Sequence, residues 1–178
     1  KGNTYVAECQ DLTLQELLDA GVRQFDLRPG YCLNETITAD NLYIWHGVTQ
    51  TSTKYVDAIK MLADFVQAHP TEAISVIMVK ENNKLGTDRS SEMWSVVNAC
   101  HTTYKDYMKV LDHSYYTLDD FRGKICYINR TGTVVNNTTQ ISNWPDDNTV
   151  SDFSCKIGNT CSANVQDKYG SNGTTKQT

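Results

Sequence analysis

Several side chains suited to catalysis come directly after apolar, β-rich runs. His46 follows the run Leu42–Trp45 and precedes Gly47, a residue that permits a sharp exit from a strand. Asp26 and Arg28 close an earlier run and are two positions apart, so they would face the same side of a strand. Parallel α/β enzymes place catalytic groups at the carboxyl ends of strands. We therefore predict that His46 lies close to Arg28 if their strands are neighbours.

The same arrangement recurs further along the chain. Lys80, Arg130 and Asp167 each follow a strand-like run, and Tyr169 comes two positions after Asp167. With Asp26, Arg28 and His46 they would form a ring of cations, acids and one imidazole. Such a ring suits an anionic phosphate carried on a polyol, and Tyr169 could stack on the apolar side of a ring substrate.

Plainer interpretations of these residues stay open at this point. Arg28 could simply pair with Asp26 on the same strand face. A histidine is more often structural or solvated than catalytic, and His69, His101 and His113 lie in helical or polar loop sequence, where a structural role is expected. His46 differs from them by its position at a strand end.

Common nucleotide-binding and catalytic motifs are missing from the sequence. It has no P-loop, no G-x-G-x-x-G, no G-x-S-x-G and no H-E-x-x-H. Nucleotide binding, serine hydrolysis and zincin chemistry are therefore disfavoured. There is also no C-x-x-C pair for a structural zinc ion. We expect neither a metal nor a cofactor.

The charge balance argues against a nucleic-acid partner. The 16 Lys and Arg face 21 Asp and Glu, which leaves a formal charge of −5 among 178 residues. A nucleic-acid binder or a polybasic membrane anchor needs the opposite balance. The longest apolar runs are also far shorter than the roughly 20 residues that span a bilayer. Any membrane contact is expected to be transient, and the protein is expected to be a monomer.

Six cysteines are scattered along the chain, and only Cys155 and Cys161 lie close together. A short disulfide-closed loop between these two is plausible in an oxidising compartment. The segment 131–149 is rich in Asn and Thr, a composition common in exported proteins. We therefore expect a secreted or extracytoplasmic location.

The elements that would carry these residues alternate along the chain. Thr13 and Glu16 form a capping box that begins a short helix, and Gly21 ends it. Helical spacing also marks 53–69 and 90–104, and 117–121 is typical of a short capped turn. Strand-like runs at 22–27, 42–45, 74–79, 124–129 and 165–166 bring the count to five strands and three helices.

Alternating strands and helices predict a single α/β domain over residues 1–178 with its active site at one edge of a parallel sheet. A closed eight-stranded barrel needs about 200 residues or more. The chain therefore folds either as an open sheet or as part of a barrel.

Five segments, taken in order, resemble the catalytic domain of bacterial phosphatidylinositol-specific phospholipases C. They are Leu14–Arg28, Trp45–Gly47, His69–Glu72 running on to Val79–Glu81, Phe121–Lys124, and Val165–Tyr169. Each segment is unspecific alone, whereas five in this order and spacing make the resemblance specific over nearly the whole chain.

This resemblance implies an irregular (β/α) TIM-type barrel, with about five of its strands in this chain. It implies attack of the inositol 2-hydroxyl on its own phosphodiester, which yields diacylglycerol and inositol 1,2-cyclic phosphate. The substrate would be phosphatidylinositol or its glycosylated form at a membrane surface. Two histidines act as base and acid in such enzymes, an arginine stabilises the phosphate charge, and calcium is not required.

The resemblance also assigns roles to individual residues. It gives His46 the role of general acid, Arg28 that of the phosphate-binding arginine, and Asp26 that of its supporting carboxylate. It gives Lys80, Arg130 and Asp167 hydrogen bonds to inositol hydroxyls, and Tyr169 a stacking position under the ring. The family's first histidine lies in a Gly-Thr-His motif that this sequence does not contain. We therefore expect a chain truncated at both ends that lacks the general base.

Two rival functions remain at the level of the sequence. A metal-dependent glycerophosphodiesterase of the same broad barrel type would group several acids around its metal, whereas here the key strand end carries Arg28. A non-catalytic module that binds inositol phosphates or lipids would account for the missing first histidine.

Overall fold

The structure is a computed structural model that describes residues 11–32, 35–81, 88–145, 152–158 and 161–166. Its helices and strands, in chain order, are α1 (Leu14–Asp19), β1 (Gln24–Leu27), β2 (Pro29–Gly30), β3 (Tyr43–His46), β4 (Thr49–Lys54), α2 (Tyr55–Ala68), β5 (Ala73–Met78), α3 (Ser90–Thr103), the 3-10 turns η2 (Lys105–Tyr107) and η3 (Leu118–Phe121), β6 (Lys124–Asn129), β7 (Thr139–Ser142), β8 (Asp152–Ile157) and β9 (Cys161–Gln166).

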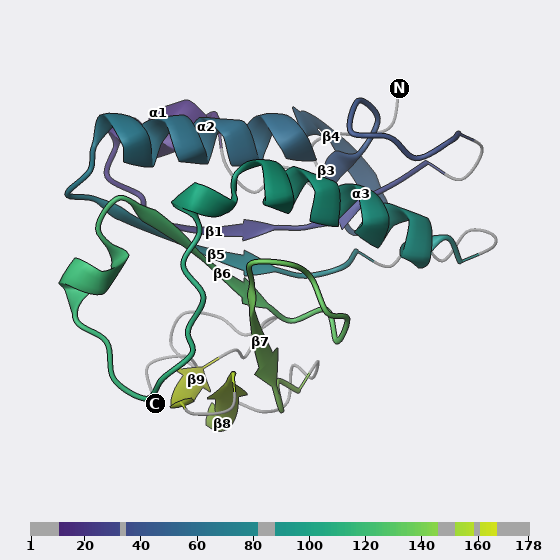
Figure 1. The fold of residues 1–178 in the computed structure, drawn as a ribbon. Helices are drawn as coiled ribbons and strands as arrows, with labels where there is room; N and C mark the ends of the chain where they lie inside the picture. Colours follow the sequence, from purple (N-terminus) through teal and green to yellow (C-terminus); the bar gives the residue numbers. More distant parts are fainter. Residues whose placement is uncertain (1–10, 33–34, 82–87, 146–151, 159–160, 167–178) are drawn as a thin grey trace.

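The main sheet is a curled, mixed sheet with the strand order β1-β5-β6-β7-β8-β9. Strands β1, β5, β6 and β7 are parallel, whereas β8 and β9 pair antiparallel at its end. Figure 1 shows α1, α2 and α3 together on one side of β1, β5 and β6, while β7, β8 and β9 turn away below them. The chain thus has a mixed α/β fold in which the sheet forms part of a barrel.

The first helix and strand follow directly from the sequence. Thr13 and Glu16 form the predicted capping box in both directions, and Gly21 adopts a left-handed φ of 93° after the helix. In β1 the side chains alternate, because Phe25 and Leu27 are buried while Gln24 and Asp26 are exposed. The strand thus covers the core with one face and leaves its polar face for a site.

A continuous core lies between the main sheet and the helices. It is built from the helix-facing side chains of β1, β5 and β6 together with the apolar faces of α2 and α3. Burial of this apolar surface is the main force that holds the helices on the sheet. The opposite face of β1, β5 and β6 is therefore the one on which polar groups can gather.

The run at 42–45 forms a strand, but its predicted place in the parallel sheet is wrong. It forms β3, which pairs antiparallel with β2 and β4 in a separate three-stranded sheet. The reason is local: Pro29 and Gly30 end the ladder of β1 and continue as the short strand β2, against which the chain folds back. Gly47, with a φ of 61°, makes the tight turn from β3 into β4.

The last predicted strand also differs from expectation. Residues 165 and 166 end β9, which pairs antiparallel with β8 over its whole length and is not a parallel strand. The segment 131–149, rich in Asn and Thr and without a predicted strand, contains β7, which joins β6 in parallel. Four strands are therefore parallel in the described part of the chain, where five were expected.

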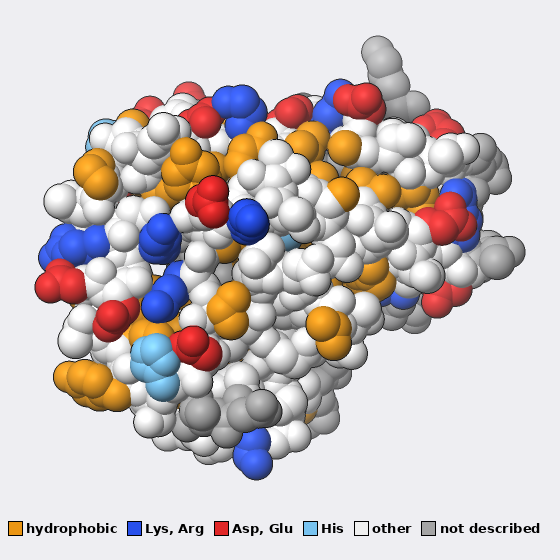
Figure 2. All heavy atoms as spheres, viewed as in Figure 1, with side chains coloured by type: hydrophobic (Ala, Val, Ile, Leu, Met, Phe, Trp, Pro, Cys, Tyr) orange, Lys and Arg blue, Asp and Glu red, His pale blue; other side chains and the backbone are white. Residues whose placement is uncertain are grey.

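The face drawn in Figure 2 carries acidic and basic side chains interspersed with one another, without a large basic cluster. None of the helices in the described residues combines the length and the apolar character that crossing a membrane would require.

Candidate functional site

Arg28 stands at the centre of a polar cluster at the carboxyl end of β1. Its Nε and Nη2 donate to the two carboxylate oxygens of Asp26, at 3.0 and 2.8 Å, and its Nη1 donates to Oε1 of Glu81 at 3.2 Å. The hydrogen bonds to Asp26 are the main cause of the raised pKa of Arg28. A guanidinium gripped on two sides is fixed in orientation and stays charged. The plain pairing of Arg28 with Asp26 is thus present, within a larger cluster.

Glu81 joins this cluster to the turn after β3. Its side chain is only 12% exposed, and the same Oε1 accepts a hydrogen bond from the backbone N–H of Gly47 at 2.7 Å. One carboxylate therefore connects the end of β5, the guanidinium of Arg28 and the β3–β4 turn.

His46 lies in the sequence between two residues that are bonded to this cluster. The N–H of Trp45 donates to the carbonyl oxygen of Arg28 at 2.9 Å, and Gly47 donates to Glu81. The imidazole is exposed at the end of β3. The predicted proximity of His46 and Arg28 thus arises through the antiparallel pairing of β2 with β3, and not through neighbouring parallel strands.

Arg130 follows β6 and faces the same side of the main sheet as Arg28. Ile125 and Tyr127 of that strand point into the core under the helices, so the alternation of side chains turns Arg130 to the other face. Its N–H donates to the carbonyl oxygen of Met78 at 2.9 Å, and its guanidinium lies over the ring of Trp144, 4.0 Å from the centroid. A stacked arginine of this kind is held in place while it keeps its charge.

Lys80 does not join this group. Val76 and Met78 of β5 are fully buried under the helices, and Lys80 continues on their side of the strand. Its Nζ lies 3.5 Å from Oδ1 of Asp88, just before α3. It lines a cavity of about 600 Å³ together with polar residues of α3 and of the β6–β7 loop, including Ser91 and Thr131. The structure thus places Lys80 on the helix side of the sheet.

Two other predicted site residues, Asp167 and Tyr169, lie outside the described residues. Glu81 is the site residue that sequence reasoning missed, since it was noticed only as the neighbour of Lys80. The signal was the alternation of side chains along 74–81, which puts residues 79 and 81 on the face opposite Met78. That signal is weak in this sequence because both faces of the strand are apolar from Ile74 to Val79.

The histidines that were expected to be structural lie elsewhere. His101 is fully buried in α3, where its Nε2 accepts from the hydroxyl of Tyr55 at 2.9 Å and its Nδ1 donates to the carbonyl oxygen of Asn136 at 3.1 Å. Burial is the main reason that the pKa of His101 falls to about 4. His69 caps the end of α2, and His113 pairs with Asp112.

The predicted short loop closed by a disulfide is not formed. The five described cysteines are free thiols, and Cys155 stands opposite Ala163 in the β8–β9 ladder, out of register with Cys161. Cys155 is buried, and the thiol of Cys161 donates to the carbonyl oxygen of His113.

The sequence and the fold were compared with those of known proteins. No family model matches the sequence. The 1-phosphatidylinositol phosphodiesterase of Listeria monocytogenes is 25% identical over 133 residues, which cover 72% of this chain and 38% of that protein. A crystal structure of a phosphatidylinositol-specific phospholipase C from Staphylococcus aureus, with pentafluorophenylalanine incorporated, superposes with a TM-score of 0.73 at 21% identity. The chain resembles the bacterial phosphatidylinositol-specific phospholipases C.

The extent of this resemblance is uneven. The Staphylococcus aureus match covers 95% of this chain and 56% of that phospholipase C. The phosphatidylinositol-specific phospholipase C of Listeria monocytogenes superposes with a TM-score of 0.53 at 24% identity, over 71% of this chain and 44% of that structure. The expected TIM-type barrel fold is thus confirmed, and the chain spans about half the length of the solved phospholipases C or less.

Proposed function

We propose that this chain is the part of a phosphatidylinositol-specific phospholipase C that stabilises the phosphate and protonates the leaving group. The substrate class is phosphatidylinositol or its glycosylated form, and the products are diacylglycerol and inositol 1,2-cyclic phosphate. The observation that carries this proposal is the guanidinium of Arg28, fixed between Asp26 and Glu81, with Glu81 also bonded to the backbone N–H of Gly47, the residue after His46.

Arg28 is suited to the charge that develops on a phosphodiester during cleavage. In the described part of the chain, three of its five N–H groups donate to Asp26 and Glu81. The other two can donate to phosphate oxygens. The two carboxylates bring two negative charges, whereas Arg28, Arg130 and a protonated His46 bring three positive ones. The cluster is therefore cationic overall when His46 carries its proton, as binding of an anionic phosphate requires.

The proposed reaction is an internal displacement at phosphorus. The 2-hydroxyl oxygen of inositol forms a new bond to phosphorus and gives its proton to a general base. The bond from phosphorus to the glycerol oxygen breaks, and the protonated imidazole of His46 donates its proton to that oxygen. No water is consumed in this step, and the phosphate remains on inositol as a five-membered cyclic diester.

The inositol ring needs hydrogen-bonding groups around the same edge. Arg130 faces the side of the sheet that carries Arg28, and we propose that it contacts ring hydroxyls together with Asp167 and Tyr169. We leave Lys80 out of this set because its side chain lies on the helix side of the sheet, paired with Asp88. Glu81 enters the proposal in a different role, as the group that orients Arg28.

The proposal needs a general base besides His46. None of the other three histidines, all in the described part of the chain, is bonded to the cluster around Arg28. His101 is buried under the helices, His69 ends α2, and His113 pairs with Asp112. We propose that the base comes from a segment of a longer protein, as in the family's two-histidine mechanism. The match covers only 56% of the Staphylococcus aureus structure and 38% of the Listeria monocytogenes protein, so both proteins extend well beyond the matched part.

The rival functions fit this site less well. A divalent metal ion would need several carboxylate oxygens, whereas both oxygens of Asp26 and Oε1 of Glu81 are hydrogen-bonded to Arg28. Binding without catalysis would not require a histidine held at the edge of a phosphate-binding cluster. A transient encounter with lipid and an extracytoplasmic location follow from the proposed substrate and stay predictions.

The proposal is tested by assaying this chain, and a longer protein that carries it together with the base, on phosphatidylinositol dispersions in the presence of a chelator. We expect the longer protein to release diacylglycerol at an unchanged rate after chelation. This chain alone should be at least about 10²-fold slower, because acid and base act together. Loss of activity on chelation and its recovery with calcium would support the metal-dependent rival instead.

A further inference from the structure

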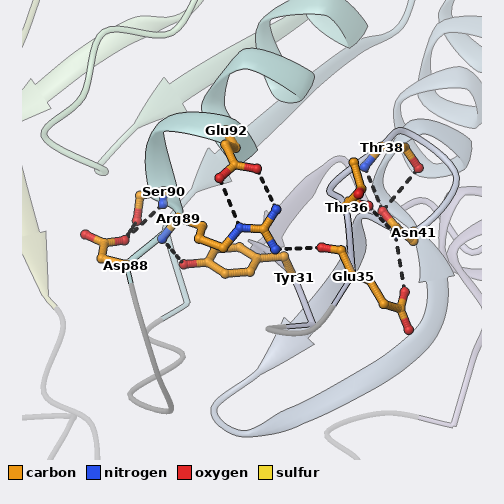
Figure 3. Close-up of polar contacts among 9 residues, drawn as sticks. All are labelled: Tyr31, Glu35, Thr36, Thr38, Asn41, Asp88, Arg89, Ser90 and Glu92. Carbon is orange, nitrogen blue, oxygen red and sulfur yellow. Dashed lines mark hydrogen bonds and ion pairs between the residues drawn. The ribbon is translucent and has the colours of Figure 1, made fainter.

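The connection between β2 and β3 is fastened to the start of α3 by one side chain. Figure 3 shows Arg89 directly before α3, with Glu92 on one side of its guanidinium and Glu35 on the other. Its Nε and Nη2 donate to the two oxygens of Glu92 at 3.0 and 2.5 Å, and its Nη1 donates to the carbonyl oxygen of Glu35 at 2.6 Å. The backbone N–H of Arg89 donates to the hydroxyl of Tyr31 at 2.8 Å.

Both acceptors in the connection are themselves held firmly. Tyr31 is only 4% exposed and belongs to the core. Asn41 organises the loop from within, since its Oδ1 accepts from the N–H of Thr38 at 2.7 Å and its Nδ2 donates to the carbonyl oxygen of Thr36 at 2.7 Å. Arg89 therefore contacts a loop whose residues 36–41 are held together by the side chain of Asn41.

The small sheet has few hydrogen bonds of its own to fix this loop. Strand β2 has only two residues, and Pro29 has no N–H to contribute to the ladder. The pairing with β3 rests on Gly30 opposite Tyr43 and on the bond from the N–H of Trp45 to Arg28. Glu81 fixes the far end of β3 through Gly47, and the contact of Arg89 with Glu35 fixes the loop that leads into β3.

From these contacts we propose that Arg89 is a positioning residue for the candidate site. By holding the β2–β3 connection against α3, it sets the place of His46 relative to the guanidinium of Arg28. The inference rests on the proposed function for its effect on catalysis, whereas the effect on the small sheet is independent of it. The bonds to Tyr31 and Glu35 are the contacts through which Arg89 acts on the cluster around Arg28.

The chain offers a matched control at another edge of the sheet. Arg122 also pairs with an acid three residues away, Asp119, and also donates to a carbonyl oxygen of a distant loop, that of Thr71 at 2.7 Å. It lies before β6, at the amino end of the parallel strands. Arg122→Ala removes the same kind of contact without touching the small sheet.

The first measurement is hydrogen exchange of single backbone amides in the intact protein. In Arg89→Ala the amides of Trp45 and Gly47 should exchange at least about tenfold faster, and in Arg122→Ala they should exchange as in the wild type. Arg89→Lys should recover only part of the protection, because an ammonium cannot reproduce the fork. Equal exchange of these amides in wild type and Arg89→Ala would contradict the proposal that Arg89 holds the β2–β3 connection in place.

The second measurement is steady-state cleavage of phosphatidylinositol by the longer protein. Arg89→Ala should lower kcat about tenfold or more while KM changes by less than about twofold, because the acid is misplaced and the substrate contacts stay. Arg122→Ala should leave both constants unchanged. If exchange responds as expected but kcat does not, Arg89 supports only the fold and the positioning role is wrong. If neither the wild type nor any variant cleaves the lipid, the proposed function is wrong. The hydrogen-exchange result then still shows whether Arg89 holds the β2–β3 connection in place.

Discussion

Arg28 and His46 carry different parts of the proposed chemistry, and substitutions separate them. His46→Ala should lower the rate on natural phosphatidylinositol by about 10²–10⁴-fold, because the glycerol oxygen is a poor leaving group without a proton. With an inositol phosphate ester of a low-pKa phenol the loss should be far smaller, since that oxygen leaves unprotonated. Parallel assays of both substrates check this. Equal losses would remove His46 from the role of general acid.

The buried His101 should make the folding stability of the protein depend on pH. Its pKa is about 4 in the folded protein, below the ordinary value of 6.5, because the ring is buried among neutral partners. The unfolded chain takes up a proton at this histidine as pH falls through 6.5, and the folded protein does so only near 4. Stability is therefore unaffected by His101 above pH 6.5 and falls between 6.5 and 4, by about 3 kcal/mol in total.

Urea unfolding of wild type and His101→Gln across pH 4 to 8 measures this contribution. The amide of Gln can donate and accept in place of the imidazole but does not titrate in this range. The stability of the variant relative to wild type should rise as pH falls from 6.5 to 4. A difference that is constant with pH would show that His101 does not titrate in this way.

At the scale of residues, the sequence pointed to strand ends that the structure brings together at Asp26, Arg28 and His46, but it missed that Glu81 and not Lys80 reaches this cluster. Strand ends were readable because apolar runs stop abruptly at polar residues. The face of each residue was not, because β5 is apolar on both sides and its alternation is hidden. Lys80 was therefore chosen over Glu81, although a strand turns one residue to the helices and the next to the site.

At the scale of elements, strands β2 and β3 pack closely where the indole of Trp45 lies against the backbone of Gly30. A Cβ added at Gly30 would lie 2.5 Å from Cδ1 of Trp45. Gly30→Ala should therefore push the indole aside and cost about 1–3 kcal/mol of stability. Because Trp45 precedes His46, the same change should lower turnover in the longer protein. Chemical denaturation gives the stability.

A double-mutant cycle with Trp45→Leu isolates this contact. In the Trp45→Leu background, Gly30→Ala should cost clearly less than in the wild type, because the smaller side chain leaves room for the methyl group. The same cost in both backgrounds would mean that the strain does not come from the indole.

Element existence was predictable where a pattern is local, and strand partners were not. The capping box of Thr13 and Glu16 and the helical spacing of 53–69 correspond to α1 and α2. A strand pattern, by contrast, states that residues are extended but not what they pair with. Residues 43–46 and 161–166 thus form strands whose antiparallel partners, β2 with β4 and β8, were missed.

For the molecule as a whole, the fold could be predicted further than the site. Alternating strands and helices give the α/β class, and the barrel follows from the resemblance and is confirmed by the superposition on phospholipases C. The site was less predictable, since it depends on which strands meet. The roles of Asp167 and Tyr169 stay predictions, because both residues lie outside the described ones.

The most direct test of the central claim is the identity of the first phosphorus product. Phosphorus NMR of phosphatidylinositol cleaved by the longer protein should show inositol 1,2-cyclic phosphate formed first, with or without a chelator. Arg28→Lys should abolish its formation, because a point charge cannot replace the fork on the phosphate. A linear inositol phosphate as the first product, or cyclic product formed at an undiminished rate by Arg28→Lys, would contradict the account.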